Sequence, residues 1–369
     1  MLRVGIFSSS RADWSIFSPL IKALNCDDSI KITIFGFAEN GVNYHQDALP
    51  FHNVNVRLFN AGFSSVETRN SAVNSYTNTI RELLPALQEA TLDGLIVLGD
   101  RFETLAAATT AYLLDIRIIH MHGGELTHGS HDDSIRHAIS KLSDLHLTSH
   151  EDYALRLSRM GERQDKIAVV GALGINQLLI EINGVQSPSN EPFILVTFHP
   201  VTNHPDLGFS ELEELLHALE TIDSHHLIFT GTNQDPGGQR IWSRIIDFIS
   251  ENPLRRQAIL NLGPHLFPRY LSHCDLFVGN SSAGLIEAPS LAPQVINIGD
   301  RQLGRLSADS VVHELADRQK IKSRINEALA GPSTTKENPF FNANGPQLAA
   351  RFILDNLPTT RSIFEDPKP

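Results

Sequence analysis

The sequence predicts an α/β protein with two parallel, doubly wound sheets, one in each half of the chain. Short apolar runs alternate with longer stretches of helical period, which is typical of strands joined by helical crossovers. The apolar runs are continuous, as expected for strands of a parallel sheet that is covered on both faces. A segment rich in Pro, Ser and Asn near the middle of the chain divides the pattern in two.

In the first half, seven apolar runs are predicted strands: Val4–Phe7, Ile32–Phe37, Val54–Leu58, Leu95–Leu98, Ile116–His120, Leu145–Thr148 and Ile167–Val170. Five amphipathic stretches are predicted helices: Trp14–Leu24, Thr68–Glu89, Phe102–Leu114, Ser134–Leu142 and Asp152–Met160. A helix separates most neighbouring strands, so this half is built from repeated β–α units.

The segment Asn183–Pro192 has neither helical nor strand period, and we predict it to be a linker. Beyond it the predicted strands are Phe193–Phe198, His226–Thr230, Leu276–Gly279 and Gln294–Ile298. The predicted helices are Glu211–Thr221, Gln239–Ser250, one that starts at Ser282, and Pro346–Leu357. We therefore expect domains over 1–182 and 193–345, a linker over 183–192, and a C-terminal helix and tail over 346–369 that pack back on the first domain.

Composition excludes several classes of function. The 369 residues include 30 Lys and Arg against 42 Asp and Glu, a net charge of −12, which argues against binding to nucleic acid or to an anionic membrane. The longest uncharged apolar stretch, Thr104–Leu114, is too short to span a bilayer. With only two cysteines and no signal-like start, the protein is expected in the cytoplasm.

Ligands of open α/β sheets bind beyond the carboxyl ends of the strands, so the residues that follow each strand are candidates. The first strand is followed by Ser8–Asp13, which is neither GxGxxG nor a P-loop. Its backbone N–H groups and Arg11 suit a phosphate, although Asp13 could simply cap the helix. Asp100 follows the fourth strand, where it could act as a base. The alternative is that it caps the next helix beside an ion pair.

The densest polar region is the loop from His120 to His137, which contains Gly123-Gly124 and Asp132-Asp133. No recognised metal spacing is present, so a polar active-site loop is favoured over a metal site. The two glycines suggest that the backbone comes close to a ligand. Asp133 and Arg136 lie three residues apart and share one helix face. Capping of the helix by Asp132 or Asp133 is the alternative to an active-site role.

The second half offers a further set of strand-end residues. His199 follows the strand Phe193–Phe198. It has either a structural role or a functional role opposite the first domain. Asn233 lies in a polar turn after the next strand. The small residues of Gly279–Gly284 lead from a strand into a helix, and their N–H groups and hydroxyls could bind a diphosphate. The alternative is a tight turn that requires small residues. Glu287 follows, where a carboxylate could accept ribose hydroxyls.

Together these segments resemble the hydrolysing UDP-N-acetylglucosamine 2-epimerases of bacterial sialic and legionaminic acid synthesis. The resemblance runs from residue 1 to about 305 and rests on seven motifs in order. These are SSSRADW (8–14), LGDRFE (98–103), HGGELTHGSHDDSIRHAISKLSDLH (122–146), VGALG (170–174), TFHPVT (197–202), GNSSAGLIE (279–287) and VINIGDRQ (295–302). Non-hydrolysing relatives have a GTRPE-like opening and an EAGLR-like segment instead, so the hydrolysing branch is favoured.

The resemblance implies the GT-B architecture, with two Rossmann-like domains and the active site in the cleft between them. It implies elimination of UDP to give 2-acetamidoglucal, followed by hydration to N-acetylmannosamine, without a metal, a nicotinamide or any other cofactor. The implied partners are the UDP-sugar substrate and the UDP product, and the expected assembly is a homodimer or homotetramer. A carboxylate base and fixed donors for the departing diphosphate are what this chemistry requires.

The resemblance also assigns residues. The expected catalytic residues are Asp100, Asp132, His199, Arg136 and His122. The expected substrate-binding residues are Arg11, Asp13, Arg101, Gly124, Asn233, Ser281, Ser282, Glu287 and Arg301. Animal and non-hydrolysing relatives have Glu where this chain has His122, which leaves open the group that protonates carbon 2.

Three alternatives remain at this point. The substrate could be UDP-N,N′-diacetylbacillosamine, because the motifs bind the parts that both sugars share. The same architecture also serves glycosyltransferases, which need an acceptor in place of water. A non-catalytic nucleotide-sugar sensor is disfavoured by the presence of both Asp100 and Asp132.

Overall fold

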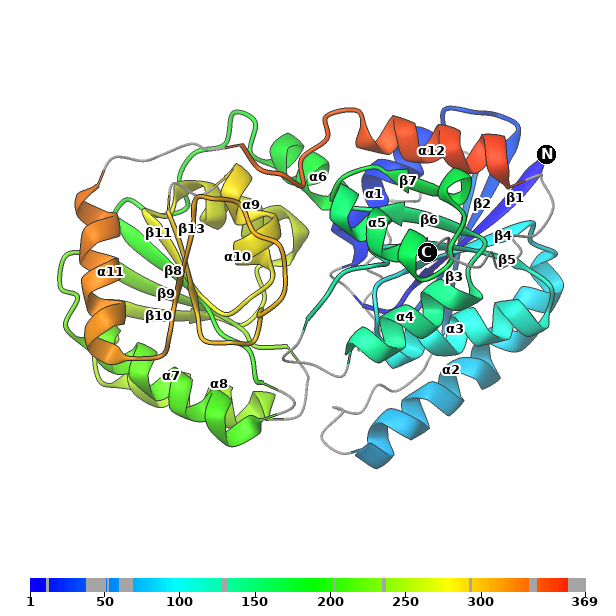
Figure 1. Ribbon diagram of the computed structural model, residues 1–369. Helices are drawn as coiled ribbons and strands as arrows, with labels where there is room; N and C mark the ends of the chain where they lie inside the picture. The colour runs from blue at the N-terminus through cyan, green and yellow to red at the C-terminus, as the bar shows by residue number, and fades with distance from the viewer. Residues whose placement is uncertain are drawn as a thin grey trace.

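The computed structural model describes residues 1–10, 13–37, 51, 53–59, 69–127, 132–201, 204–233, 237–291, 294–331 and 337–357, without the side chains of 69 and 70. The predicted fold class is confirmed, because these residues form two parallel sheets with helices between most successive strands (Figure 1). Both described cysteines are free, Cys26 being exposed and Cys274 buried. In the described part of the chain, no helix is long and apolar enough to cross a bilayer.

The first sheet has the strand order β3-β2-β1-β4-β5-β6-β7, and all its pairs are parallel. Its strands are β1 (Leu2–Ser8), β2 (Ile30–Phe37), β3 (Val54–Phe59), β4 (Gly94–Leu98), β5 (Arg117–Met121), β6 (Leu145–Thr148) and β7 (Ile167–Val169). Its helices are α1 (Asp13–Leu24), α2 (Arg69–Ala90), α3 (Phe102–Leu113), α4 (Asp132–Leu142), α5 (Glu151–Arg159) and α6 (Leu173–Glu181).

The second sheet has the order β10-β9-β8-β11-β12-β13 and is also parallel. Its strands are β8 (Phe193–Thr197), β9 (His226–Thr230), β10 (Arg256–Ile259), β11 (Leu276–Gly279), β12 (Val295–Ile298) and β13 (Val311–Glu314). Its helices are α7 (Pro205–Glu220), α8 (Gly238–Ser250), α9 (Gly263–His273), α10 (Ala283–Ile286) and α11 (Arg318–Ala330). Short 3₁₀ turns lie at Gln164–Lys166 and Ala288–Ser290.

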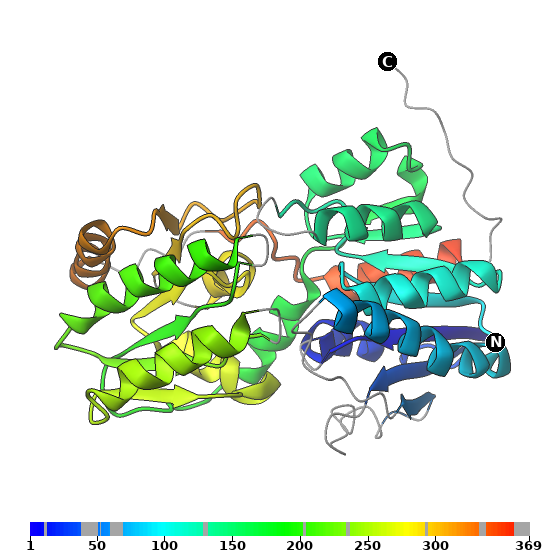
Figure 2. The ribbon, with the colours of Figure 1, turned by 90° about the horizontal axis from the view of Figure 1, so that it is seen from below.

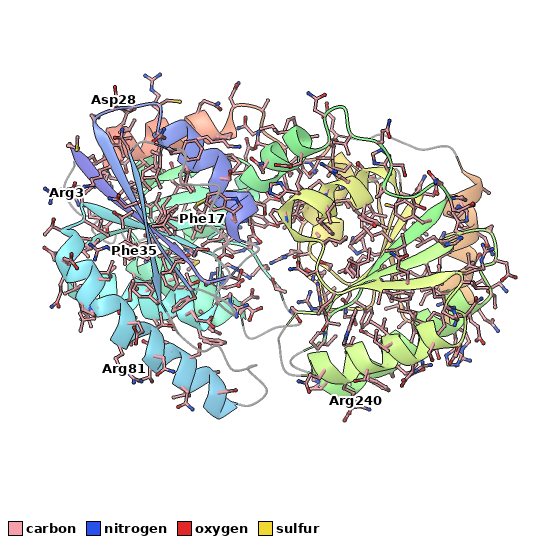
Figure 3. All side chains as sticks on the ribbon, turned by 180° about the vertical axis from the view of Figure 1, so that it is seen from behind. Arg3, Phe17, Asp28, Phe35, Arg81 and Arg240 are labelled. Atoms are coloured by element: carbon pink, nitrogen blue, oxygen red, sulfur yellow. The ribbon has the colours of Figure 1, made fainter. Side chains whose placement is uncertain are left out.

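Apolar side chains cover both faces of each sheet, as continuous apolar strands require. In the first half, Phe17 of α1 packs in the core on one face, and Phe35 of β2 packs in the core on the other. Figure 3 shows both inside this half, whereas Arg81 and Arg240 lie on outer helices. The last helix, α12 (Gly345–Asn356), packs against α1 and adds Ala349 and Ile353 to the core of the first half.

Several elements differ from the predictions for identifiable reasons. Helix α7 begins at Pro205, six residues before the predicted start, because proline suits the first helical turn. The helix predicted from Ser282 has only four residues and gives way to a 3₁₀ turn that contains Pro289. Helix α11 was not predicted, since its charged sequence buries little beyond Ile321 and Ile325. Helices α6 and α9 and strands β10 and β13 were also missed. The domain boundaries themselves stay a prediction.

Candidate active site

The strand order places the candidate residues at two equivalent points of the fold. In the first sheet the order reverses between β1 and β4, and in the second between β8 and β11. Ligands of open α/β sheets bind at such reversal points, beyond the carboxyl ends of the strands. Asp13 and Asp100 follow β1 and β4, whereas His199 and Asn280 follow β8 and β11. Both halves therefore present polar side chains where a ligand of this fold is expected.

Asp13 shapes the turn after β1. Its carboxylate accepts the N–H groups of Ser9 (2.7 Å) and Ser10 (2.9 Å) and both of their hydroxyls. Burial raises the pKa of Asp13, while the hydrogen bonds from Ser10 and the charge of Arg101 oppose this. Arg101 is partly exposed and donates to the buried Glu103 at 3.2 Å. Asp13 and Arg101, which were both predicted to bind the substrate, therefore have partners within the protein. Arg11, also predicted to bind it, lies outside the described residues.

Arg136 is the centre of the polar cluster in the first half. Only 1% of its side chain is exposed. Its Nη1 donates to the Glu125 carbonyl (2.8 Å) and to the Asp133 carboxylate (2.6 Å), and its Nη2 donates to the Asp100 carboxylate and to Thr127 Oγ1 (3.2 Å). One guanidinium thus holds together the start of α4, the turn after β4 and the loop after β5. The predicted neighbourhood of Asp133 and Arg136 on α4 is confirmed.

The two adjacent acids at the start of α4 differ in their surroundings. Asp133 accepts the backbone N–H of Thr127 at 2.7 Å, so this residue fixes the loop to the helix. Asp132, the first residue of α4, is half-buried. The catalytic assignment of Asp132 stays a prediction.

His120 supports the turn that carries Asp100. The buried imidazole donates from Nε2 to the Gly99 carbonyl at 2.8 Å, and its Nδ1 lies 3.0 Å from Ser140 Oγ. Burial lowers the pKa of His120 to about 3, so the ring is uncharged at neutral pH. Gly99 itself has a φ of 71°, which favours glycine. A neutral histidine therefore fixes the turn that contains Asp100.

The two glycines of the loop after β5 are required by the protein's own packing. At Gly124, where φ is 79°, an added Cβ would lie 2.4 Å from the Tyr153 carbonyl oxygen. At Gly123 it would lie 2.9 Å from His120 Nδ1. Packing within the protein is therefore sufficient to require both glycines, and a ligand contact at Gly124 stays a prediction.

Asn280 organises the equivalent region of the second half. Its buried amide accepts the N–H of His199 at 2.7 Å and donates to the His199 carbonyl at 2.8 Å. Its own carbonyl accepts from Arg301 Nη1 (3.1 Å) and Gln302 Nε2 (2.9 Å). Gly279 precedes it, and a Cβ there would lie 1.9 Å from the Thr197 carbonyl oxygen. The ends of β8 and β11 and the loop after β12 are thus joined through one residue, by its side chain and its backbone carbonyl.

His199 is held as a neutral donor. The backbone N–H of Asn233 donates to His199 Nδ1 at 3.1 Å, so the ring proton is on Nε2. Burial and then the charge of Arg301 lower the pKa of His199 to about 3. The structure thus brings together three of the predicted residues, His199, Asn233 and Arg301. Ser281 and Ser282 lie directly after Asn280 at the start of α10.

The two halves meet along a mixed apolar and ionic seam. Tyr153, Ile175, Leu285 and Phe340 are among the buried residues of one cluster that spans both halves. Arg305 of the second half lies 3.3 Å from the Glu125 carboxylate of the first. Figure 2, seen from below, shows the two halves side by side. Glu125, whose carbonyl accepts from Arg136, therefore also has a partner from the second half.

His122 and Glu287 lie at this seam. His122 Nδ1 is 2.8 Å from Glu125 Oε1. Burial raises the pKa of Glu287 to about 7, and the positive charges of His122 and Arg305 oppose the shift. Within the described ranges, no group of three or more His, Cys, Asp or Glu side chains is arranged to hold a metal ion.

Three residues of this site were not assigned a role from the sequence. Glu125 belongs to the motif that starts at His122, and the two glycines before it could have marked it as a functional residue. Asn280 stands between a strand-end glycine and two serines in another motif. Arg305 lies outside all seven motifs, and only the contact between the two halves shows that its partner is Glu125.

Glu211 of α7 lies beneath the turn that leads to Arg301, and it yields a pH prediction. Burial, with the nearby charge of Asp300, raises its pKa to about 7 from the ordinary 4.5. Its stabilising contribution is therefore complete below about pH 4.5 and is lost as pH rises to about 7. Glu211→Gln imitates the protonated group, so relative to wild type the variant is expected to gain up to about 3 kcal/mol of unfolding free energy between pH 4.5 and 8.

Urea unfolding at a series of pH values measures this difference. Glu213→Gln is the matched control, because Glu213 lies on the same helix but pairs with Arg244 near the surface at 2.7 Å. The prediction fails if the two variants show the same pH dependence relative to wild type.

Two parallel α/β units with polar residues at neighbouring reversal points define a two-domain protein of the GT-B type. Residues 46–354 match the family model described as UDP-N-acetylglucosamine 2-epimerase. The chain belongs to this family of enzymes.

Individual relatives agree with this assignment. The chain is 30% identical over 328 residues to a GDP/UDP-N,N′-diacetylbacillosamine 2-epimerase (hydrolyzing) of Campylobacter jejuni, covering 84% of this chain and 83% of that one. It is 32% identical over 294 residues to a UDP-N-acetylglucosamine 2-epimerase of Neisseria meningitidis serogroup B, covering 78% and 77%. A crystal structure of a Neisseria meningitidis UDP-GlcNAc 2-epimerase bound to UDP-GlcNAc superposes with a TM-score of 0.77 at 20% identity, covering 96% and 100%, which shows the shared fold.

Proposed function

We propose that the protein is a hydrolysing UDP-N-acetylglucosamine 2-epimerase that releases UDP and N-acetylmannosamine. The observation that carries this proposal is that each half presents a polar cluster beyond the carboxyl ends of its strands, and that Arg305 of the second half pairs with Glu125 of the first. The first half contributes carboxylates organised by Arg136, and the second contributes a neutral histidine and a guanidinium organised by Asn280. The first set suits the role of a base, and the second set suits donation to a departing diphosphate. The hydrolysing branch is supported by the SSSRADW and HGGE segments and by the name of the Campylobacter relative.

The reaction has two steps. In the first, a base takes the proton from carbon 2, the C–H electron pair forms the carbon 1–carbon 2 double bond, and the carbon 1–oxygen bond breaks with its electrons leaving on UDP. In the second, water adds to carbon 1 and a proton adds to the opposite face of carbon 2. The sum consumes one water and gives UDP and the epimeric sugar. Because the proton leaves and returns on opposite faces, the two transfers need two protein groups.

Residue roles follow from these requirements. Asp100 or Asp132 takes the proton from carbon 2, and Arg136 orients Asp100. His199, whose proton is on Nε2, donates to the leaving phosphate oxygen. Arg11, Asn233, Ser281, Ser282, Glu287 and Arg301 hold UDP, Asp13 lies near the sugar, and Arg101 and Gly124 contact the substrate. A cytoplasmic location and a homodimer or homotetramer stay predictions.

A second substrate is favoured by one observation. The Campylobacter relative is named for UDP-N,N′-diacetylbacillosamine and is about as similar to this chain as the Neisseria relative named for UDP-N-acetylglucosamine. The two sugars differ at carbons 4 and 6, away from the atoms that react.

The deciding experiment is incubation with each UDP-sugar in turn, with NMR of the released sugar and with EDTA in a parallel sample. We expect UDP and N-acetylmannosamine from UDP-N-acetylglucosamine, with the same rate in EDTA. Product from the bacillosamine nucleotide alone would assign the alternative substrate. Interconversion of UDP-sugars without release of UDP would assign a non-hydrolysing enzyme.

Arg301→Ala and Ser282→Ala are each expected to weaken UDP binding about ten- to a hundredfold. A lost hydrogen bond to a charged group is worth roughly 1.5–3 kcal/mol, which corresponds to that change in affinity. Titration calorimetry with UDP measures the effect. Arg318→Ala is the control, because Arg318 belongs to the same half but pairs with Glu214 on the surface. Unchanged affinity in both test variants would remove these residues from the UDP site.

A further inference from the structure

His122 is held in an unusual conformation at the end of β5. Its φ of 61° lies in the left-handed region, which is costly for a residue other than glycine. Its backbone N–H donates to the Leu147 carbonyl at 3.0 Å, and only 13% of its side chain is exposed. The surrounding structure therefore determines where this imidazole lies.

Glu125 determines which ring nitrogen of His122 has the proton. Glu125 Oε1 lies 2.8 Å from His122 Nδ1 and accepts Ser149 Oγ at 3.0 Å, while Oε2 faces Arg305 Nη2 at 3.3 Å. Burial would raise the pKa of Glu125, but Arg305 and the hydrogen bond with His122 outweigh burial and hold it well below its usual value. An ionised carboxylate only accepts, so His122 must donate from Nδ1.

The other nitrogen of His122 has no partner within the protein. Among the described residues, Nε2 is buried and makes no hydrogen bond, and the same holds for Glu287 Oε2 and Arg305 Nε. The charges of His122 and Arg305 both act on Glu287, so these three groups from both halves share one electrostatic environment. Buried polar atoms without partners are rare in proteins and indicate a ligand or water that pairs with them.

We propose that Glu125 is a positioning residue that fixes His122 with its Nδ1 proton on the carboxylate, so that Nε2 exchanges a proton with the substrate. Arg305 of the second half holds Glu125 in place, so the arrangement is complete only when the two halves are together. This inference rests on the proposed function and names the second proton-transfer group that the reaction requires. The Asp100 carboxylate is paired with the Arg136 guanidinium, so Asp100 is suited to act as the base. The protonated ring of His122 is suited to act as the acid.

In the hydration step, the Nε2–H bond of protonated His122 breaks and its proton forms the new bond to carbon 2. The electrons of the carbon 1–carbon 2 double bond make that bond. Water then attacks carbon 1, and its proton passes to a carboxylate. Release to solvent of this proton and of the proton taken from carbon 2, with uptake of one proton by His122, restores the enzyme.

The test begins with the full-length wild-type protein, labelled with ¹⁵N-histidine. The ring signals of His122 are assigned by their loss in His122→Gln. We expect the neutral ring of His122 to have its proton on Nδ1. A proton on Nε2 would overturn the proposal, and this measurement depends on neither turnover nor any variant of Glu125. Absence of hydrolysis with every UDP-sugar would instead contradict the proposed function.

Glu125→Gln is the second arm. We expect turnover to fall about ten- to a hundredfold, with UDP affinity nearly unchanged and the Nδ1–H tautomer no longer dominant. Loss of the Glu125 charge removes the anion paired with His122, so the high-pH limb of the turnover profile is expected to move to lower pH. Wild-type turnover and an unmoved profile would overturn the proposal.

Glu162→Gln is the matched control. Glu162 Oε2 lies 3.2 Å from His146 Nε2 in another buried histidine–carboxylate pair, and neither residue belongs to the predicted site. We expect this variant to keep wild-type turnover and an unchanged pH profile. Thermal melting of both variants separates loss of folding from loss of proton transfer.

Discussion

Asp100→Asn is expected to lower turnover about a hundred- to ten-thousandfold while changing UDP affinity little. An amide matches the carboxylate in size but cannot take a proton, and general-base catalysis contributes a factor of that order. The predicted UDP-binding residues lie mainly in the second half, so nucleotide affinity should be nearly independent of Asp100. Turnover, UDP affinity by calorimetry and deuterium incorporation at carbon 2 are the measurements.

Asp133→Asn is the control for this prediction. Asp133 pairs with the same guanidinium of Arg136, at 2.6 Å, so its loss disturbs Arg136 without removing the expected base. We expect a smaller loss of turnover in Asp133→Asn. Equal losses in both variants would mean that Asp100 acts by holding Arg136. Near-normal turnover in Asp100→Asn would leave Asp132 or His122 as the base.

Arg136→Met is expected to lower the free energy of unfolding by about 3–5 kcal/mol and to abolish turnover. Removing one partner of a buried ionic network leaves the others with uncompensated charges. Here the orphaned groups are two carboxylates, from Asp100 and Asp133, together with the carbonyl of Glu125. Methionine fills much of the volume, so the loss reports on charge and hydrogen bonding rather than on a cavity.

Urea unfolding measures this loss, and Arg57→Met is its control. Arg57 also makes two hydrogen bonds to a carboxylate, that of Glu89, but 35% and 71% of these side chains are exposed. Exposed ion pairs contribute about 0–1 kcal/mol. A loss in Arg136→Met no larger than in Arg57→Met would show that the buried network contributes nothing to stability.

Alternation of apolar runs and helical stretches was sufficient to predict the two sheets, because burial of a parallel sheet on both faces demands it. Two of the elements it missed lack that signal. Strand β10 (Arg256–Ile259) begins with two polar residues, and α11 (Arg318–Ala330) is mostly charged. Neighbouring elements and the cap of Asp317, which accepts two backbone N–H groups, stabilise them instead.

Local chain position likewise predicted where polar residues gather. Asp100 and His199 are strand-end residues in the sequence as in the structure, and the residues Asp133 and Arg136 meet because one helical turn separates them. Such contacts depend on the spacing of a few residues, which a sequence displays directly.

Contacts between distant residues were decided by the tertiary structure alone. Glu125 and Arg305 are far apart in the chain, and Asn280 reaches His199 only because β8 and β11 are adjacent in the second sheet. The sequence by itself determined the α/β class, the strand-end candidates and the family motifs, because each depends on local pattern. The tertiary structure decided which carboxylate pairs with Arg136, which nitrogen of His199 has the proton and what faces His122, because burial and partners from other elements control ionisation and hydrogen bonding.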